Sequence, residues 1–166
     1  MAEPAKKPIV NIDDAPMNDV GNGRQFVARV GRVGQLLGLN ALGCSVTVVP
    51  PGKRAFPFHR HHVQDELFFV VSGNGAYRFG DDALPVRAGD IVAAPAGTKA
   101  HQLINTGTED LRYLAISTGG SVDIVDYPDS NKIGVAAGVK NADWRTATYK
   151  GMGRLTPADY FDGEDA

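Results

Sequence analysis

Short runs of β-branched and aromatic residues, each bounded by turn residues, are the feature that most constrains this chain. The runs lie between residues 42 and 118 and cover 45–49, 66–71, 76–79, 84–86, 91–94, 101–105 and 111–117. Most of the 20 glycines are turn residues of this kind, because glycine supplies the positive φ that tight turns need. Many short strands at this spacing, with no helical period between them, indicate an antiparallel sandwich or barrel.

The two ends of the chain differ from this central part. Residues 1–23 are polar and interrupted by prolines, so we expect an arm with little structure of its own. Residues 24–118 are expected to form the barrel. Residues 119–166 are too short and too weakly patterned to form a core of their own, so we expect an extension that packs on the barrel.

Charge and hydropathy argue against two classes of partner. Seventeen Lys and Arg against nineteen Asp and Glu give a net charge of −2, whereas a nucleic-acid binder normally shows a basic face. No apolar run approaches the ~20 residues that a membrane-spanning helix needs, and we expect no secretory signal. Cys44 is the only cysteine, so an intrachain disulfide is impossible. We therefore expect a cytoplasmic protein without nucleic-acid or membrane partners.

All four histidines lie in two short segments. His59, His61 and His62 precede the run that begins at Glu66, and His101 begins a later run. His59 and His61 are two residues apart, so on a strand both imidazoles point to the same face. A carboxylate at the start of a buried strand is costly unless it meets a cation or strong donors. A metal ion would be such a partner.

Three imidazoles and one carboxylate make a mixed nitrogen and oxygen site for one divalent transition metal per chain. The imidazoles are those of His59, His61 and His101, and either Asp65 or Glu66 supplies the carboxylate. Such a donor set suits Zn, Mn, Fe, Ni or Co. The alternative is a polar strand face without a metal, but the third histidine and the carboxylate together favour a metal site. In octahedral geometry two positions stay open for water or substrate, which leaves room for catalysis.

The two histidine segments resemble the two conserved motifs of the cupin superfamily. The first motif reads G, five residues, H-x-H, three or four residues, E, six residues, G. Its places are filled by Gly52, His59, His61, Glu66 and Gly73. The second motif reads G, five residues, P-x-G, two residues, H, three residues, N. Its places are filled by Gly89, Pro95, Gly97, His101 and Asn105. Two spacings depart by one extra residue, before His59 and before His101, and both lie in loops.

This resemblance covers about residues 44–118 and implies an all-β fold. The fold would be a double-stranded β-helix, or jelly-roll barrel, carrying an N-terminal arm and a C-terminal extension. The resemblance also implies that the metal is held inside the barrel by His59, His61, Glu66 and His101, which favours Glu66 over Asp65 as the carboxylate ligand.

Two further stretches, 101–107 and 126–130, resemble a subgroup of single-domain bacterial cupins. Some members of that subgroup are named as candidate sugar phosphate isomerases. The resemblance also implies a homodimer, and we expect the weak strand at 24–33 to add across the edge of the second subunit.

We therefore expect a metal-dependent enzyme that acts on a small polar or anionic metabolite, with sugar phosphate isomerisation as the leading reaction. One alternative is a metal-dependent oxygenase or lyase on the same ligands. Another is a non-catalytic small-molecule-binding or sensor protein. No catalytic base is evident, and the weak candidates for a hydrogen-bond donor or general acid are Tyr77 and Gln102.

Several other side chains have a functional and a structural interpretation. Four basic residues would contact an anionic substrate or simply be solvated: Lys53, Arg54, Arg78 and Lys99. Four aromatic residues would line a pocket over the metal or pack in the core: Phe56, Phe58, Phe68 and Phe79. We expect His62 to be a solvated loop residue and Asn105 to satisfy backbone groups in a turn.

Overall fold

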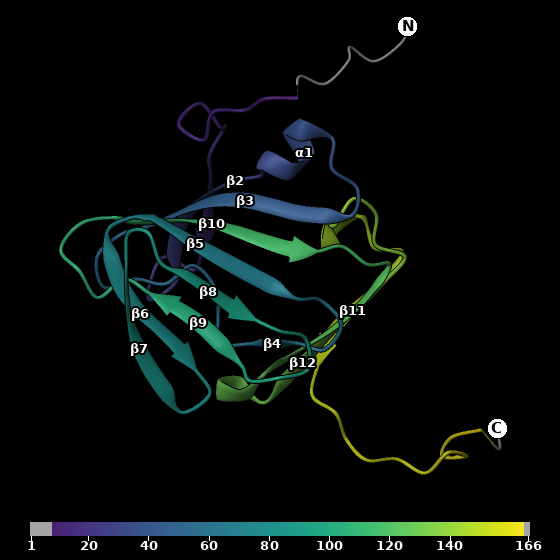
Figure 1. Cartoon of the computed structure of the whole chain (residues 1–166). Helices are drawn as coiled ribbons and strands as arrows, with labels where there is room; N and C mark the ends of the chain where they lie inside the picture. The colour runs from purple at the N-terminus through teal and green to yellow at the C-terminus, as the bar shows by residue number, and fades with distance from the viewer. Residues whose placement is uncertain (1–7, 165–166) are drawn as a thin grey trace, which may run out of the picture.

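Antiparallel strands dominate the structure, a computed structural model that describes residues 8–164 (Figure 1). Residues 1–7 of the predicted arm and residues 165–166 of the predicted extension lie outside the described residues. The strands are β1 (Asn18–Gly21), β2 (Val27–Gly31), β3 (Leu42–Val49), β4 (Arg60–His61), β5 (Glu66–Ser72), β6 (Asn74–Phe79), β7 (Asp82–Arg87), β8 (Ile91–Ala94), β9 (His101–Ile104), β10 (Leu111–Thr118), β11 (Val122–Tyr127), β12 (Lys132–Ala137) and β13 (Tyr149–Gly153). The helical segments are α1 (Val33–Leu37), η1 (Pro128–Ser130) and η2 (Trp144–Thr146).

The strands form three sheets. The six-stranded sheet has the order β1-β2-β3-β10-β5-β8, the four-stranded sheet β13-β12-β11-β4, and the three-stranded sheet β7-β6-β9. In Figure 1 the sheet that contains β3, β10 and β5 runs across the top of the barrel, and β6, β7 and β9 close its lower left. The predicted all-β double-stranded β-helix is confirmed, and each of the seven predicted runs corresponds to a strand.

Side chains that point into the barrel form its core. Along β10, Leu111 and Tyr113 are almost fully buried and alternate with more exposed residues, the pattern of a strand with one face on the core. The other large members of this cluster are Val49, Phe68, Val70, Tyr77, Val86 and Leu103. Because burying one such side chain contributes roughly 1.5–3 kcal/mol, this cluster supplies much of the stability of the barrel.

The outer face of β3 and β10 is covered by the chain's own N-terminal region. Ala15, Val33 and Val46 are buried there in a second apolar cluster. Arg112 on β10 ties this region down by pairing with Asp13 and donating to the Ile12 carbonyl at 2.9 Å. The described part of the predicted arm thus docks on its own barrel.

One expectation for this region is wrong. The segment 24–33 contains β2, whose two edges are both hydrogen-bonded within the chain, to β1 and to β3. That strand is therefore not available to a second subunit. The edge strands of this sheet are β1, which lies within residues 1–23, and β8.

The predicted extension after residue 118 contains three strands that the sequence analysis did not assign. β11, β12 and β13 form an antiparallel sheet, and β11 also pairs with the short β4. This pairing brings the C-terminal part of the chain beside the histidine segment. Beyond β13 the chain runs away from the body of the protein (Figure 1). No helix among residues 8–164 combines the length and apolarity needed to span a membrane.

The turn between β5 and β6 depends on Gly73. Its φ is 80°, and a β-carbon at this position would collide with the backbone carbonyl of Asp110. Gly89, in the turn before β8, has a φ of 93° but nothing within 4 Å of its ideal β-carbon position. A β-carbon at either position would therefore strain the backbone, but only at Gly73 would it also collide with neighbouring atoms.

We predict that Gly73→Ala lowers the free energy of unfolding by more than Gly89→Ala does. Both variants place a β-carbon in the left-handed region, which costs about 1–2 kcal/mol. Only Gly73→Ala must also displace backbone, so its loss is expected to be larger by about 1 kcal/mol or more. Chemical denaturation of the two variants measures the difference, and equal losses would contradict the assignment.

Candidate metal centre

The main chain brings the two histidine segments together. His59 precedes β4, and His101 begins β9. The amide of His59 donates to the His101 carbonyl at 3.2 Å, and the amide of His101 donates back to the His59 carbonyl at 2.7 Å. This reciprocal bridge places both imidazoles on the inner face of the barrel beside the first residue of β5, Glu66.

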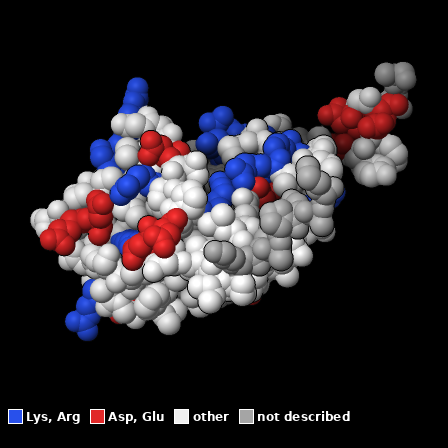
Figure 2. Space-filling model, turned by 90° about the horizontal axis from the view of Figure 1, so that it is seen from above, with Lys and Arg blue, Asp and Glu red and all other residues white. Residues whose placement is uncertain are grey.

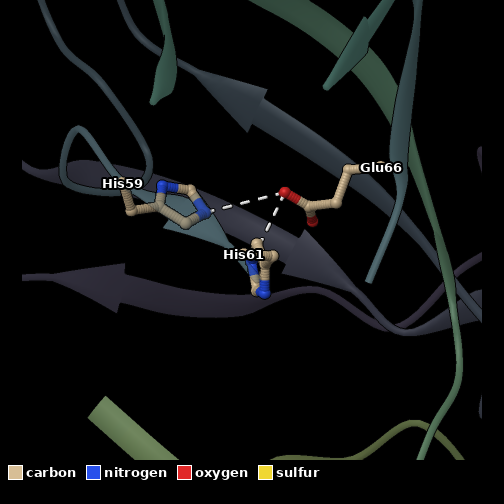
Figure 3. A group of neighbouring side chains, drawn as sticks. All are labelled: His59, His61 and Glu66. Atoms are coloured by element: carbon tan, nitrogen blue, oxygen red, sulfur yellow. Dashed lines mark ion pairs between the residues drawn. The ribbon is translucent and has the colours of Figure 1, made fainter. Parts of the chain in front are cut away.

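The side chains of His59, His61 and Glu66 converge on one point. The Nε2 atoms of His59 and His61 lie 3.6 and 3.5 Å from Oε2 of Glu66 (Figure 3). Ligand atoms from these three residues all lie within 4.8 Å of one another. Nε2 of His101 lies 2.8 Å from the same carboxylate oxygen. The structure thus brings the three predicted histidine ligands to the carboxylate of the fourth ligand, Glu66. His59, His61 and Glu66 form a compact triad, and His101 joins it through a hydrogen bond.

Two hydrogen-bond acceptors, one backbone carbonyl and one carboxylate, set the tautomers of the triad histidines. Nδ1 of His59 lies 2.7 Å from the carbonyl oxygen of Pro57, which can only accept, so Nδ1 carries the proton. Nδ1 of His61 lies 2.5 Å from Oδ2 of Asp123 in the same way. In the neutral form of both residues Nε2 then carries the lone pair on the side of Glu66, which is the form that binds a metal.

Asp123 is the residue that the sequence analysis missed. It lies on β11 with no exposed side-chain surface, and its Oδ1 accepts the Ile124 amide at 2.9 Å. The alternation along β11 places Asp123 on the same buried face as Val125. If β11 had been predicted as a strand, the carboxylate at a core-facing position would have identified Asp123, because a buried charge needs a partner.

The environment favours an ionised Glu66 and a neutral His101, and it favours a proton on His61. Burial acts to raise the pKa of Glu66, but hydrogen bonds and charge from the surrounding histidines hold it far below its ordinary value. Burial acts to lower the pKa of His61, yet the hydrogen bond to Asp123 and the charges of Glu66 and Asp123 outweigh burial and raise it. Burial lowers the pKa of His101. Glu66 is therefore an anion and His101 a neutral imidazole at neutral pH.

The chemistry of these donors fits a divalent transition metal. Two imidazoles with free Nε2 lone pairs face one ionised carboxylate, and a third imidazole is within reach of it. Asp65, the alternative carboxylate, points elsewhere, because its Oδ1 accepts the Ala96 amide at 2.8 Å. Of these two neighbouring carboxylates, Glu66 is therefore the one that faces the histidines.

Two cavities are lined by histidines of the triad, and a third, of about 290 Å³, is lined by Glu66 but by neither histidine. One, of about 160 Å³, is lined by His59 and Glu66 and extends toward α1 and β3. The other, of about 180 Å³, is lined by His59 and His61 together with Tyr127 and Trp144. Small molecules therefore have room beside the candidate ligands.

The two residues proposed as hydrogen-bond donors or general acids are occupied by backbone contacts. Tyr77 is buried in the core, where its hydroxyl donates to the Ala93 carbonyl at 2.9 Å, and burial raises its pKa. Gln102 is also buried, and its amide donates to the Phe56 carbonyl at 2.7 Å. Neither side chain lines the two cavities at the triad.

The four basic residues singled out from the sequence also lie away from these cavities. Lys53 donates to the Arg24 carbonyl at 2.8 Å, and Lys99 pairs with Asp82 at 3.4 Å. The guanidinium of Arg78 forms two hydrogen bonds to Asp129 and stacks 3.5 Å over the ring of Phe58. Arg54 is half-buried, and its amide donates to the Gln25 carbonyl at 3.1 Å.

The aromatic candidates divide between cavity and core. Phe56 lines both cavities at the triad, and Phe68 lines the first of them. Phe58 is buried, and Phe79 stacks on Tyr77.

Two polar residues next to the ligands have structural contacts. His62 hydrogen-bonds to Asp126 at 2.8 Å on the surface of the protein. Asn105 is fully buried and bridges the carbonyls of Val49 and Glu109, each at 2.7 Å, which confirms its predicted role in satisfying turn backbone.

Comparisons with known proteins agree with the fold and the site. The chain is 26% identical to a protein of Acidithiobacillus ferrooxidans named as a candidate sugar phosphate isomerase. The two structures superpose with a TM-score of 0.70 over 87% of this chain and 90% of that one. A sugar phosphate isomerase of the cupin superfamily from Silicibacter pomeroyi shares the fold, with a TM-score of 0.76, 21% identity, and coverage of 92% and 98%.

A curated relative, the oxalate-binding protein of Thermotoga maritima, is 31% identical over 68 residues. The match covers 41% of this chain and 54% of the relative, so the chain spans about half the length of that protein. The cupin domain family matches residues 45–117, which contain all four candidate ligands. Residues 45–117 therefore match the cupin domain family, and the chain resembles small bacterial cupins in its fold.

Proposed function

We propose that this protein is a metal-dependent enzyme that acts on a small polar or anionic metabolite, with sugar phosphate isomerisation as the leading reaction. The observation that carries the proposal is the convergence of His59, His61 and Glu66 beside cavities large enough for a small molecule. The likeness to the Acidithiobacillus ferrooxidans protein, over most of both chains, supports the choice of reaction.

In this proposal His59, His61, Glu66 and His101 hold one divalent metal ion. When bound, such an ion polarises a carbonyl or hydroxyl oxygen and stabilises negative charge that develops on it. Asp123 keeps His61 in the tautomer that presents Nε2, and Pro57 does the same for His59. Phe56 and Phe68 supply apolar walls that limit the access of water to the site.

A non-catalytic binding protein is the second candidate. The curated relative from Thermotoga maritima is named for binding oxalate rather than for a reaction. The same metal and cavity would then hold a small ligand without converting it. Retention of a ligand without turnover, across a panel of metabolites, would favour this candidate.

We also propose a homodimer, as the cupin resemblance implies. β1, β8 and β13 each end a sheet and carry an unpaired edge within the described residues, where a second copy can add a strand.

Metal binding is the first test of the proposal. We expect metal-free protein to take up one equivalent of Zn²⁺ or Mn²⁺ per chain. Glu66→Gln should weaken uptake by more than the roughly 10- to 100-fold that changes outside the ligand shell cause, because it removes an anionic ligand. Asp65→Asn is the matched control, since Asp65 faces the Ala96 amide, and its affinity should equal that of the wild type. Titration calorimetry measures both, and no uptake by the wild type would refute the proposal.

The role of Asp123 gives a second prediction. Asp123→Asn keeps the size of the side chain but removes the charge that orients and polarises His61. We expect metal affinity to fall by roughly 10- to 100-fold. A circular dichroism spectrum like that of the wild type would show that the fold is retained. An unchanged affinity would mean that His61 is oriented by the backbone alone.

Turnover separates the enzymatic proposal from the binding protein. Metal-loaded protein should interconvert an aldose phosphate and the matching ketose phosphate, followed by ¹³C NMR, and chelation should abolish the reaction. Glu66→Gln is expected to show no turnover at the metal concentration that saturates the wild type. Metal binding without isomerisation of any phosphosugar in the panel would overturn the leading reaction but not the metal site.

A further inference from the structure

The first cavity connects solvent to the candidate metal site. At its outer end lie Arg32, Asn141 and Phe56, all exposed, and at its inner end lie His59 and Glu66. A ligand that enters this cavity can therefore contact Arg32 as well as His59 and Glu66 of the triad. The walls between them carry the side chains of Gln35, Ser45 and Ser117.

Arg32 is the basic residue on this path that is free to bind a ligand. It forms no ion pair with any residue in the part of the chain that the structure describes. Arg145, on η2, is occupied, because its guanidinium forms hydrogen bonds of 2.7–3.0 Å to Asp143. Gln35 donates to the same carboxylate at 2.9 Å. The carboxylate of Asp143 is thus hydrogen-bonded to Arg145 and Gln35, and the hydrogen bond from Arg145, together with the charges of Arg145 and Arg32, lowers its pKa.

The charge distribution along the cavity favours an anion at the outer end. Among the described residues that line this cavity, Glu66 is the acidic one and Arg32 the basic one, so an anionic group is favoured beside Arg32. The positive end of the cavity is Arg32, whose planar guanidinium suits bidentate binding of phosphate or carboxylate. Figure 2 views the molecule from above, the side on which α1 lies in Figure 1, and shows both Lys or Arg and Asp or Glu side chains on that face.

The loop that forms one wall of the cavity is held in a strained conformation. Asn141 and Ala142 both line the cavity and have φ values of 55° and 50°. For alanine this region is sterically costly, and strain of this kind persists only where surrounding contacts impose it. The contacts are those of Thr146, whose Oγ1 accepts the Lys140 amide at 2.8 Å and donates to the Asp143 carbonyl at 2.7 Å. Hydrogen bonds to Thr146 therefore tie this loop at Lys140 and Asp143.

We propose that Arg32 is the anion-binding residue of the substrate cavity, and that it holds the phosphate or carboxylate group of a small ligand whose other end reaches the triad. This inference deepens the proposed function and rests on it. It names a residue that the sequence analysis did not single out, in place of the four basic residues that lie elsewhere. Arg32 is a substrate-binding residue here and takes no part in holding the metal.

NMR titration of metal-free ¹⁵N-labelled protein with inorganic phosphate, and separately with acetate, tests the proposal. We expect saturable shifts of the amides of Arg32, Gln35 and Asn141, and Arg32→Gln should weaken binding about tenfold or more. Arg87→Gln is the matched control, because Arg87 is exposed on β7, away from the cavity. The anion that binds more tightly identifies the charged group of the ligand.

Three outcomes are decisive. Binding that is lost in Arg32→Gln and kept in Arg87→Gln supports the proposal. No binding of either anion, or equal affinities for wild type and Arg32→Gln, overturns it. The Zn²⁺ affinity of Arg32→Gln is expected to match that of the wild type. Its titration separates the proposed metal site from the proposed anion site at Arg32. Failure of metal uptake by the wild type refutes the proposed function, whereas normal uptake without an Arg32-dependent anion site refutes only this inference.

Discussion

The carboxylate of Glu66 is the group on which the organisation of this protein depends. It is an anion held at the inner end of a barrel, where an unpaired charge would be strongly destabilising. The fold compensates for it with three imidazoles that come from two segments about forty residues apart, His59 and His61 in one and His101 in the other. The same compensation creates a set of donors that suits a divalent metal.

The barrel and the C-terminal sheet are joined at this site. β4 carries His61 and pairs with β11. Asp123 on β11 hydrogen-bonds to Nδ1 of His61. The last third of the chain therefore contributes to the site directly. A buried carboxylate behind a histidine fixes the ring and raises its basicity, which is the usual second contact of a metal-binding histidine.

The basic side chains of this protein differ in whether they already have a partner. Most of the basic residues near the barrel are committed to carboxylates, carbonyls or aromatic rings, as Arg78 is to Asp129. Arg32 is the exception that lines a cavity leading to Glu66. Its place in that lining is what connects the proposed metal site to the proposed binding of an anionic ligand.

The sequence by itself determined the strand runs, the turns and the identity of the candidate ligands. Alternation and turn chemistry are local, and the spacing of His59, His61 and Glu66 is short enough to be read along one segment. Only the tertiary structure decided that β11 pairs with β4, that Asp123 supports His61, and that Arg32 rather than Arg78 lines the cavity. These contacts join residues far apart in the chain, so they depend on strand order and register, which no local pattern specifies.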